Sequence, residues 1–279
     1  MALNLQSLDA RSAAYHQTCR WQDVVLYALG VGAKAEELEF LFEKFGPKVL
    51  PTYLVSLGYE ACWSLFDVIG GDFKGVVHSS QRIQVHRLPR VGETLSTDAR
   101  VSGLYDLKRM AIATVMTETR DAEGGLLAEN EWSFIYRFDG GFGGPPPPRA
   151  PRLHYPERAP ELHFEDSVSP EQALLFRLSG DLNPLHADPE LAKSVGFDRP
   201  ILHGLSTYGF LDRALVQKLC AGDPSRLKTL HVQFRKPVFP GETLVSEGWV
   251  EGDRVLLRMQ TKERPGDFVV DQSYAEITG

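Results

Sequence analysis

The feature of this 279-residue chain that most constrains its fold is an internal repeat. A Gly-Glu-Thr-Leu segment that begins at Gly92 returns at Gly241, which gives an offset of 149 residues (241 − 92). The anchors that share this offset without a gap are residues 91–95 with 240–244, Gln84 with Gln233, Pro51 with Pro200, and residues 27–29 with 176–178. Several matches at one offset are hard to attribute to chance. The sequence therefore predicts two copies of one unit, packed as a pseudo-dimer within one chain.

A glycine- and proline-rich segment separates the two copies. Residues 140–148 read Gly-Gly-Phe-Gly-Gly-Pro-Pro-Pro-Pro, a composition that supports neither a helix nor an inner strand. We therefore predict a first repeat over residues 1–144, a proline-rich linker over 145–160 and a second repeat over 161–279.

Each copy shows helical periodicity first and strand patterns afterwards. Ser169 is expected to cap the helix that follows Pro170, with Gln172 reaching back toward it. The predicted helices span about 22–30, 35–45 and 59–69 in the first copy and about 170–179, 188–196 and 204–220 in the second. The predicted strands lie between 73 and 138 in the first copy and at about 227–236, 242–251, 254–263 and 267–277 in the second. This order predicts an α+β fold.

Composition excludes several classes of function. The net charge of −7 argues against a nucleic-acid partner, and no run of about 18 apolar residues predicts a membrane span. Three scattered cysteines suit a reducing compartment and form no metal-binding pair. The N-terminus lacks a secretory apolar region and the C-terminus lacks a peroxisomal Ser-Lys-Leu tripeptide, so we expect a cytoplasmic protein. Without a glycine-rich phosphate loop, we expect no nucleotide cofactor. We also expect no metal site.

Three polar residues that can handle protons or hydrogen bonds follow one of the predicted helices. Asp181, Asn183 and His186, called the polar triplet below, lie within six residues, directly after a glycine that can end the helix. A second segment, Arg-Pro-Ile-Leu-His-Gly at 199–204, opens the next helix. At the repeat offset the first copy has Gly32, Lys34 and Glu37 instead, so we expect it to lack catalytic residues.

The pattern Phe-x-Leu-Ser-Gly-Asp-x-Asn-Pro-Leu-His at 176–186, followed by Ala192, resembles the signature of the hydratase 2 group of the MaoC-like family. Residues 26–33 resemble the N-terminal half of the hydratase 2 region of the peroxisomal multifunctional enzymes of type 2. The resemblance implies a double hot-dog fold, in which antiparallel sheets each wrap a long helix. It also implies a hydro-lyase of fatty-acid metabolism that hydrates trans-2-enoyl-CoA to (3R)-3-hydroxyacyl-CoA, reversibly. Coenzyme A would belong to the substrate, and we expect a homodimer.

The residues can be assigned to this chemistry independently. Hydration of an enoyl thioester needs an activated water, a proton at C2 and stabilisation of the enolate-like oxygen. Asp181 and His186 gripping one water could supply both proton steps, since burial raises a carboxyl pKa and histidine titrates near neutrality. Asn183 could hold the water or tie the loop. Gly204 opens a helix whose free N–H groups favour an oxyanion, and glycine admits the thioester closely.

Other residues suggest how the rest of the substrate binds. Arg235 and Lys236 could contact coenzyme A phosphates, although a solvated strand end is the alternative. An acyl tail could enter the first copy, in the space that the missing polar triplet would occupy there. The alternative is that the apolar residues at this place are ordinary core. The apolar residues available there are Leu54, Tyr59, Cys62, Trp63 and Phe66, preceded by Leu38, Phe42 and Phe45. His203 has the character of a structural residue.

Other functions remain open from the sequence. Hot-dog folds also serve thioesterases, and the thioester could be carried by an acyl carrier protein, with dehydration as the physiological direction. A non-catalytic acyl-binding subunit is a third class, which the intact polar triplet disfavours. The Asp-x-Asn pair also starts calcium loops, but Leu185 occupies a position where such a loop needs a ligand.

Overall fold

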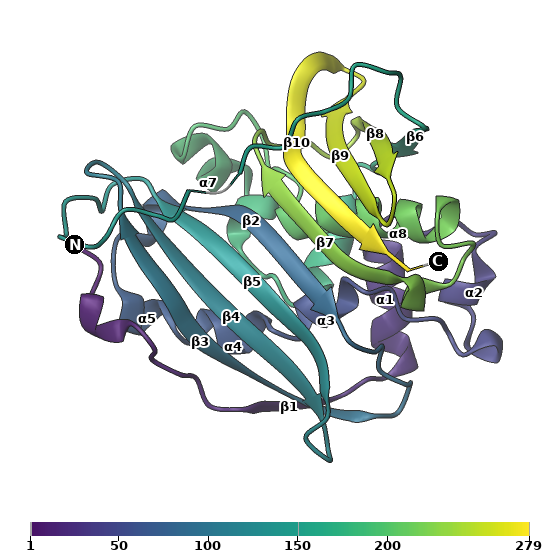
Figure 1. The fold of residues 1–279 in the computed structure, drawn as a ribbon, viewed down its shortest axis with the longest axis horizontal. Coiled ribbons are helices and arrows are strands. Elements are labelled where there is room, and N and C mark those ends of the chain that lie inside the picture. Colours follow the sequence, from purple (N-terminus) through teal and green to yellow (C-terminus); the bar gives the residue numbers. More distant parts are fainter. Residues whose placement is uncertain (1, 150, 279) are drawn as a thin grey trace.

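The computed structural model describes residues 2–149 and 151–278, and its ten strands form one antiparallel sheet (Figure 1). The strand order is β1-β3-β4-β5-β2-β7-β10-β9-β8-β6, so each copy contributes five neighbouring strands. The first-copy strands are β1 Tyr15–Thr18, β2 Val76–Val85, β3 Thr94–Asp106, β4 Ala111–Asp121 and β5 Leu126–Tyr136. The second-copy strands are β6 Leu162–Ser167, β7 Leu227–Phe234, β8 Thr243–Glu251, β9 Arg254–Thr261 and β10 Arg264–Ile277.

The two copies meet where β2 pairs with β7, and the register of this pair is symmetric under the repeat offset. Arg82 lies opposite His231, which is its equivalent 149 residues later. On either side, Ser80 faces Gln233 and Gln84 faces Thr229, two pairs that the offset exchanges. A pseudo-twofold axis therefore passes between Arg82 and His231, and the predicted repeat is present in the fold as the double hot-dog.

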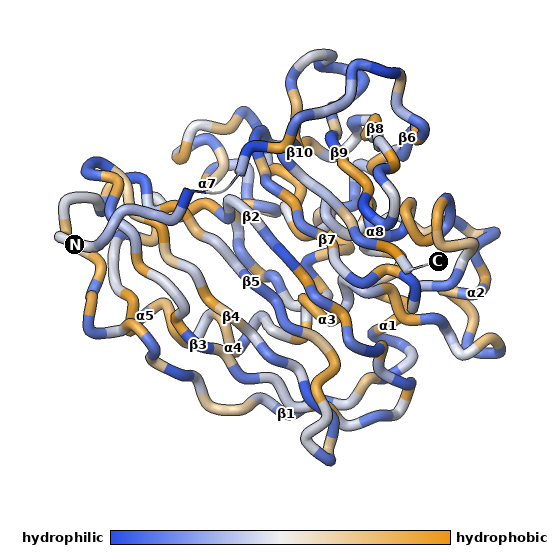
Figure 2. Tube along the Cα trace, in the orientation of Figure 1, coloured by the Kyte–Doolittle hydropathy of each residue, from blue (hydrophilic) through white to orange (hydrophobic). Residues whose placement is uncertain are grey.

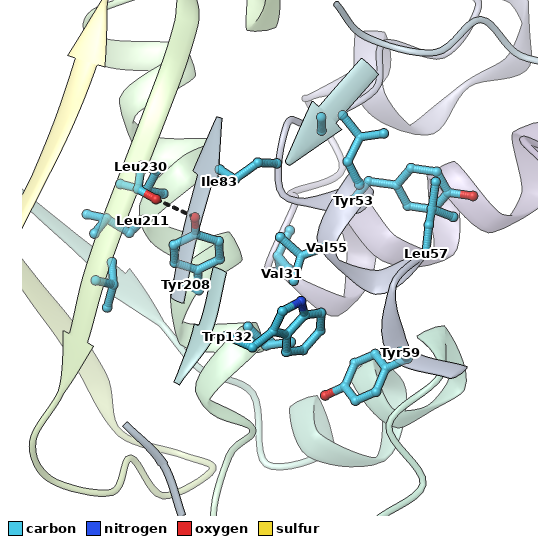
Figure 3. Packing of buried hydrophobic residues seen from close by; sticks show 14 of the residues in the cluster. Val31, Tyr53, Val55, Leu57, Tyr59, Ile83, Trp132, Tyr208, Leu211 and Leu230 are labelled. Atoms are coloured by element: carbon cyan, nitrogen blue, oxygen red, sulfur yellow. Dashed lines mark hydrogen bonds between the residues drawn. The ribbon is translucent and has the colours of Figure 1, made fainter. Parts of the chain in front are cut away.

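Helices α3, α4, α5 and α8 lie behind the sheet in the view of Figure 1. Helix α8, Gly204–Lys218, is a continuous 15-residue helix with its central part buried, and Tyr208 of this helix donates a hydrogen bond to the Leu230 carbonyl (Figure 3). The other second-copy helices are α6 Gln172–Phe176 and α7 Pro189–Ser194, and those of the first copy are α1 Trp21–Gly30, α2 Leu38–Leu41, α3 Tyr53–Ser56, α4 Tyr59–Trp63 and α5 Phe66–Ile69. Short 3₁₀ turns are η1 Leu5–Ser7, η2 Glu43–Phe45, η3 Phe73–Gly75, η4 Arg177–Ser179, η5 Pro184–His186 and η6 Pro224–Arg226.

The long helix expected in the first copy is wrong, because α3, α4 and α5 are three short helices where the second copy has α8. The first break falls at Gly58, where a Cβ atom would lie 2.9 Å from the Thr117 hydroxyl and 3.3 Å from the Trp132 ring. Glycine is therefore needed for close approach to the sheet, and glycine is a poor helix former. The N–H of Gly58 bonds to the Val55 carbonyl three residues back, which is the tighter 3₁₀ pattern.

The predicted capping of α6 is also wrong. The helix begins at Gln172, and Glu171 before it makes no side-chain capping bond. The Gln172 amide instead donates to the carbonyls of Leu29 and Gly30, both at 2.8 Å. These two carbonyls lie at the C-terminal end of α1, where a helix has no N–H group four residues ahead to bond them. The Gln172 side chain therefore caps a helix of the other copy. The short strands β1 and β6 at the two edges of the sheet were not predicted.

Burial alternates along the central strands, as expected for a sheet with one covered face. In β4 every second residue from Ala111 to Thr119 is buried. Figure 2 shows both hydrophobic and hydrophilic segments along the strands of the sheet. Residues 145–149 and 151–160 of the predicted linker contain no helix or strand. Tyr155 anchors this linker to the second copy, since its ring packs on Trp249 at 5.1 Å and its hydroxyl accepts a bond from the Gln272 N–H.

The first copy has no open space at the positions equivalent to the polar triplet. A Cβ atom on Gly32, the equivalent of Asp181, would lie 2.1 Å from the Phe210 ring. Glu37, the equivalent of His186, is buried and pairs with Arg213 at 2.7 Å. Arg213 also donates to Asp166 and, at 3.1 Å, to the Val31 carbonyl. The lost site has become a packed, ion-paired contact between the copies.

Replacing Arg213 with Met should destabilise the protein strongly. The Arg213 side chain is 3% exposed, so the change leaves the carboxylates of Glu37 and Asp166 without their cation. Breaking a buried pair in this way costs about 3–5 kcal/mol in the free energy of unfolding. Urea unfolding measures the loss. Arg100→Met is the control, because the Arg100–Asp9 pair is exposed and such pairs contribute about 0–1 kcal/mol. Equal stability of the two variants would contradict the assigned role.

Candidate active site

The loop between η4 and η5 is held by local hydrogen bonds that its own sequence supplies. Gly180 ends η4 with a φ of +125°, a conformation that favours glycine. The Asn183 N–H donates to Asp181 Oδ1 at 3.1 Å, and Asn183 Oδ1 accepts from the Leu185 N–H at 3.0 Å. The Asn183 side-chain oxygen thus ties the loop and caps η5. The loop places Asp181 and His186 on the same cavity.

His186 presents one free ring nitrogen to this cavity. Its Nδ1 lies 2.8 Å from the Ile201 carbonyl, which can only accept, so Nδ1 carries the hydrogen and Nε2 keeps its lone pair. Burial lowers the pKa of His186, and the nearby Asp181 only partly offsets this. The imidazole is therefore neutral near neutral pH and able to accept a proton through Nε2.

Asp181 is also buried, and both of its carboxyl oxygens accept hydrogen bonds. The second donor is the Tyr59 hydroxyl, which bonds to Oδ2 from helix α4 of the first copy. The backbone carbonyl of Asp181 accepts from His203 Nε2 at 3.1 Å. The rings of His203 and His186 stack with their centroids 3.7 Å apart, and burial lowers the pKa of His203 to about 3. His203 is thus a neutral residue that holds the loop.

A cavity of about 570 Å³ brings the four predicted residues together: Asp181, Asn183, His186 and Gly204 all line it. Gly204 is the first residue of α8, whose first-turn N–H groups lack intrahelical acceptors. A Cβ atom there would lie 3.4 Å from the Phe234 ring, an ordinary contact. The protein therefore does not itself require glycine here, and the open side is available to a ligand oxygen.

The predicted acyl-binding residues divide into three groups. Tyr59, Cys62 and Trp63 line the cavity, whereas Leu54 and Phe66 lie in the hydrophobic core. The earlier aromatic and aliphatic residues are exposed on the surface and do not line the cavity: Leu38 by 46%, Phe42 by 39% and Phe45 by 55%. Phe42 and Phe45 pack on each other, with ring centroids 5.8 Å apart. Helical spacing predicted a buried face there that the short α2 and η2 do not form.

Arg235 and Lys236 are exposed and line the same cavity, joined there by Lys74 and Arg137 of the first copy. No local sequence pattern groups these four cations, because they meet only through the pairing of β2 with β7 and β5. His78 of β2 was missed for the same reason. It also lines the cavity, stacks on Trp132, and has its pKa lowered to about 4 by burial.

Asp181, His186 and His203 also place one potential metal-ligand atom each within 4.8 Å of one another. One nitrogen of each ring is already bonded to a carbonyl, at 2.8 Å for His186 and 3.1 Å for His203. Each ring therefore has a single nitrogen left for a ligand. The expectation that no metal is bound stays a prediction.

Comparison with known proteins extends over both copies. Residues 18–138 match the model of the MFE-2 hydratase 2 N-terminal domain, and residues 153–269 match that of the MaoC like domain. The chain is 36% identical to the peroxisomal enoyl-CoA hydratase 2 of Arabidopsis thaliana, over 92% of this chain and 90% of that protein. It belongs to the MaoC-like hydratase 2 family.

Two further relatives support this assignment. The crystal structure of a MaoC-like dehydratase from Phytophthora capsici superposes with a TM-score of 0.87 at 34% identity, covering 99% of each chain. The peroxisomal multifunctional enzyme type 2 of Mus musculus is 36% identical over 91% of this chain, which spans only 36% of that longer protein. The similarity to the multifunctional relative therefore covers most of this chain but only about a third of that protein.

Asp181→Asn and His186→Ala should each lower turnover of an enoyl thioester by about 10²–10⁴-fold, the usual effect of losing a positioned proton-transfer group. Both side chains sit at a cavity wall, so the fold should survive, as circular dichroism and thermal unfolding would show. A folded variant of either residue that keeps wild-type turnover would exclude it from the catalytic pair.

Gly204→Pro should lower turnover by about 10²–10³-fold, since it removes one N–H donor at the start of α8. Proline is tolerated in the first turn of a helix, so stability should change little. Gly204→Ala is the companion variant: it keeps the N–H and meets only an ordinary contact with Phe234. Steady-state kinetics should show a smaller loss for Ala than for Pro. Unchanged turnover in Gly204→Pro would move the oxyanion site elsewhere.

Proposed function

We propose that this protein catalyses the reversible, (R)-specific hydration of trans-2-enoyl-CoA to (3R)-3-hydroxyacyl-CoA. The observation that carries the proposal is the convergence of a neutral His186, Asp181 and the N-terminus of α8 on one cavity. Membership of the hydratase 2 family supports it, as do the relatives named enoyl-CoA hydratase 2.

The geometry suggests how these groups divide the reaction. Asp181 and His186 hold one water between them, and His186 Nε2 accepts a proton as the water oxygen attacks C3. The same pair returns a proton to C2, so that the elements of one water molecule are added across the double bond. The Gly204 N–H donates to the thioester oxygen, where negative charge develops in the transition state.

Loss of the enoyl-thioester absorbance band of crotonyl-CoA, followed by chiral analysis of the product, tests this proposal. The expected result is loss of absorbance without release of free coenzyme A, and a product of (3R) configuration. Release of free coenzyme A from a saturated acyl-CoA would instead indicate a thioesterase. A (3S) product, or no reaction with either substrate, would contradict the proposal.

We further infer that the acyl chain runs along helix α4 of the first copy. Cys62, Trp63, Phe73 and Val77 give the cavity an apolar wall on that side. The path differs from the one expected from the sequence, because Phe210 and Arg213 fill the lost site itself. Each methylene removed from water along this wall would contribute about 0.8 kcal/mol to binding.

A series of enoyl-CoA substrates from four to sixteen carbons should therefore show kcat/KM maintained or rising beyond six carbons. Trp63→Ala removes apolar wall and should raise KM for the longer substrates several-fold while leaving crotonyl-CoA unaffected. Phe45→Ala is the control, because Phe45 is exposed and outside the cavity. A steep fall of wild-type kcat/KM beyond six carbons would contradict this path for the chain.

We propose that Lys74, Arg137, Arg235 and Lys236 contact the phosphates of coenzyme A at the cavity mouth. The alternative carrier is an acyl carrier protein, and KM values for the same acyl group on each carrier distinguish the two.

No helix within residues 2–149 and 151–278 has the length and apolar character needed to cross a membrane. The cytoplasmic location, the homodimer and the absence of a cofactor remain predictions, and the Arabidopsis thaliana and Mus musculus relatives are named as peroxisomal.

A further inference from the structure

Tyr59 reaches the proposed active site from the copy that lacks the polar triplet. It lies on α4 and is 7% exposed, and its hydroxyl donates to Asp181 Oδ2. The ring packs edge-on against Trp132 with centroids 5.5 Å apart, and Figure 3 shows the two side by side. On the other side, a Cβ atom on Gly180 would lie 3.7 Å from the Tyr59 ring. The hydroxyl is thus held in place by packing on both copies.

The Asp181 carboxyl group is held by one donor from each copy. Its Oδ1 accepts the Asn183 N–H within the loop, and its Oδ2 accepts the Tyr59 hydroxyl across the interface. Hydrogen bonds to both oxygens fix the orientation of the carboxyl group. Burial raises the pKa of Tyr59 well above its usual value, and the nearby charge of Asp181 adds to this effect. Tyr59 therefore stays protonated throughout the working pH range and acts toward Asp181 only as a donor.

We propose that Tyr59 is a positioning residue of the active site, which orients the Asp181 carboxylate for the reaction by holding its Oδ2 from the first copy. The inference rests on the proposed hydratase activity. It assigns to the first copy a part in the chemistry, beyond the acyl-binding role inferred above.

The other titratable groups around Asp181 leave this role to Tyr59. His186 on η5, His203 before α8 and His78 on β2 each have a pKa lowered first by burial, so near neutral pH they carry no positive charge. The positive charge of Arg177 on η4 contributes to lowering the pKa of His203. Among the described residues, the hydrogen bonds recorded to the Asp181 carboxyl oxygens come from Tyr59 and from the Asn183 backbone.

The repeat supplies a matched control. Tyr208 is the equivalent of Tyr59 at the 149-residue offset, and it too is buried. Its hydroxyl donates to the Leu230 carbonyl at 2.6 Å, and it does not line the cavity. Tyr208→Phe thus removes the same hydroxyl from the same kind of helix position without touching the site.

The test compares wild type, Tyr59→Phe and Tyr208→Phe in steady-state hydration of crotonyl-CoA. Loss of the hydroxyl leaves Asp181 Oδ2 without its donor from the first copy, so the carboxylate is no longer held in its reactive orientation while the substrate still binds. We expect Tyr59→Phe to lower kcat by about 10–100-fold, with KM changed less than about threefold. Tyr208→Phe should keep both the wild-type kcat and the wild-type KM.

A wild-type kcat in Tyr59→Phe would overturn the proposal, and so would a raised KM with an unchanged kcat, which indicates a role in substrate binding. A readout without turnover separates this outcome from failure of the proposed function. The carboxylate stretch of Asp181, assigned by difference from Asp181→Asn, is recorded by infrared spectroscopy in the intact protein. Its frequency should shift in Tyr59→Phe, where Oδ2 loses a hydrogen bond, and not in Tyr208→Phe. An unchanged frequency in Tyr59→Phe would overturn the proposal, whether or not the protein hydrates crotonyl-CoA.

Discussion

The structure depends on one backbone interaction, the antiparallel pairing of β2 with β7. This pairing joins two five-stranded sheets into one and sets the pseudo-twofold axis between Arg82 and His231. Because the register of a sheet is fixed to whole residues, it also fixes which parts of the two copies meet behind the sheet. Helix α4 of one copy is thereby placed against the Asp181 loop of the other, and the cavity forms between them.

Burial at this junction then determines the chemistry of the side chains. It lowers the pKa values of His78, His186 and His203, so three imidazoles in one region remain neutral together. The carbonyl partners decide the tautomers, and only His186 combines a free Nε2 with a place on the cavity wall. Removal from water also strengthens the electrostatic interaction of each remaining dipole with a nearby charge, which suits a site that must stabilise a developing oxyanion.

The two copies have diverged around the same framework in a physically coherent way. Where the second copy keeps Asp181 and His186, the first has Gly32 beneath Phe210 and Glu37 paired with Arg213. One junction is therefore open and polar, and the other is closed and ion-paired. The first-copy helix is first interrupted at Gly58, which lies too close to Thr117 and Trp132 for a side chain.

The sequence by itself determined what depends on local hydrogen bonds and on periodicity. The repeat, most strands, helix α8 and the loop from Gly180 to His186 all follow from neighbouring residues, as in the bond from the Leu185 N–H to Asn183 Oδ1. Tertiary structure alone decided the partners that are remote in the chain. Tyr59 lies 122 residues before Asp181, and Gln172 caps a helix that ends 142 residues before it. Such contacts require the two copies to be docked, because no local pattern encodes which distant donor will meet a buried acceptor.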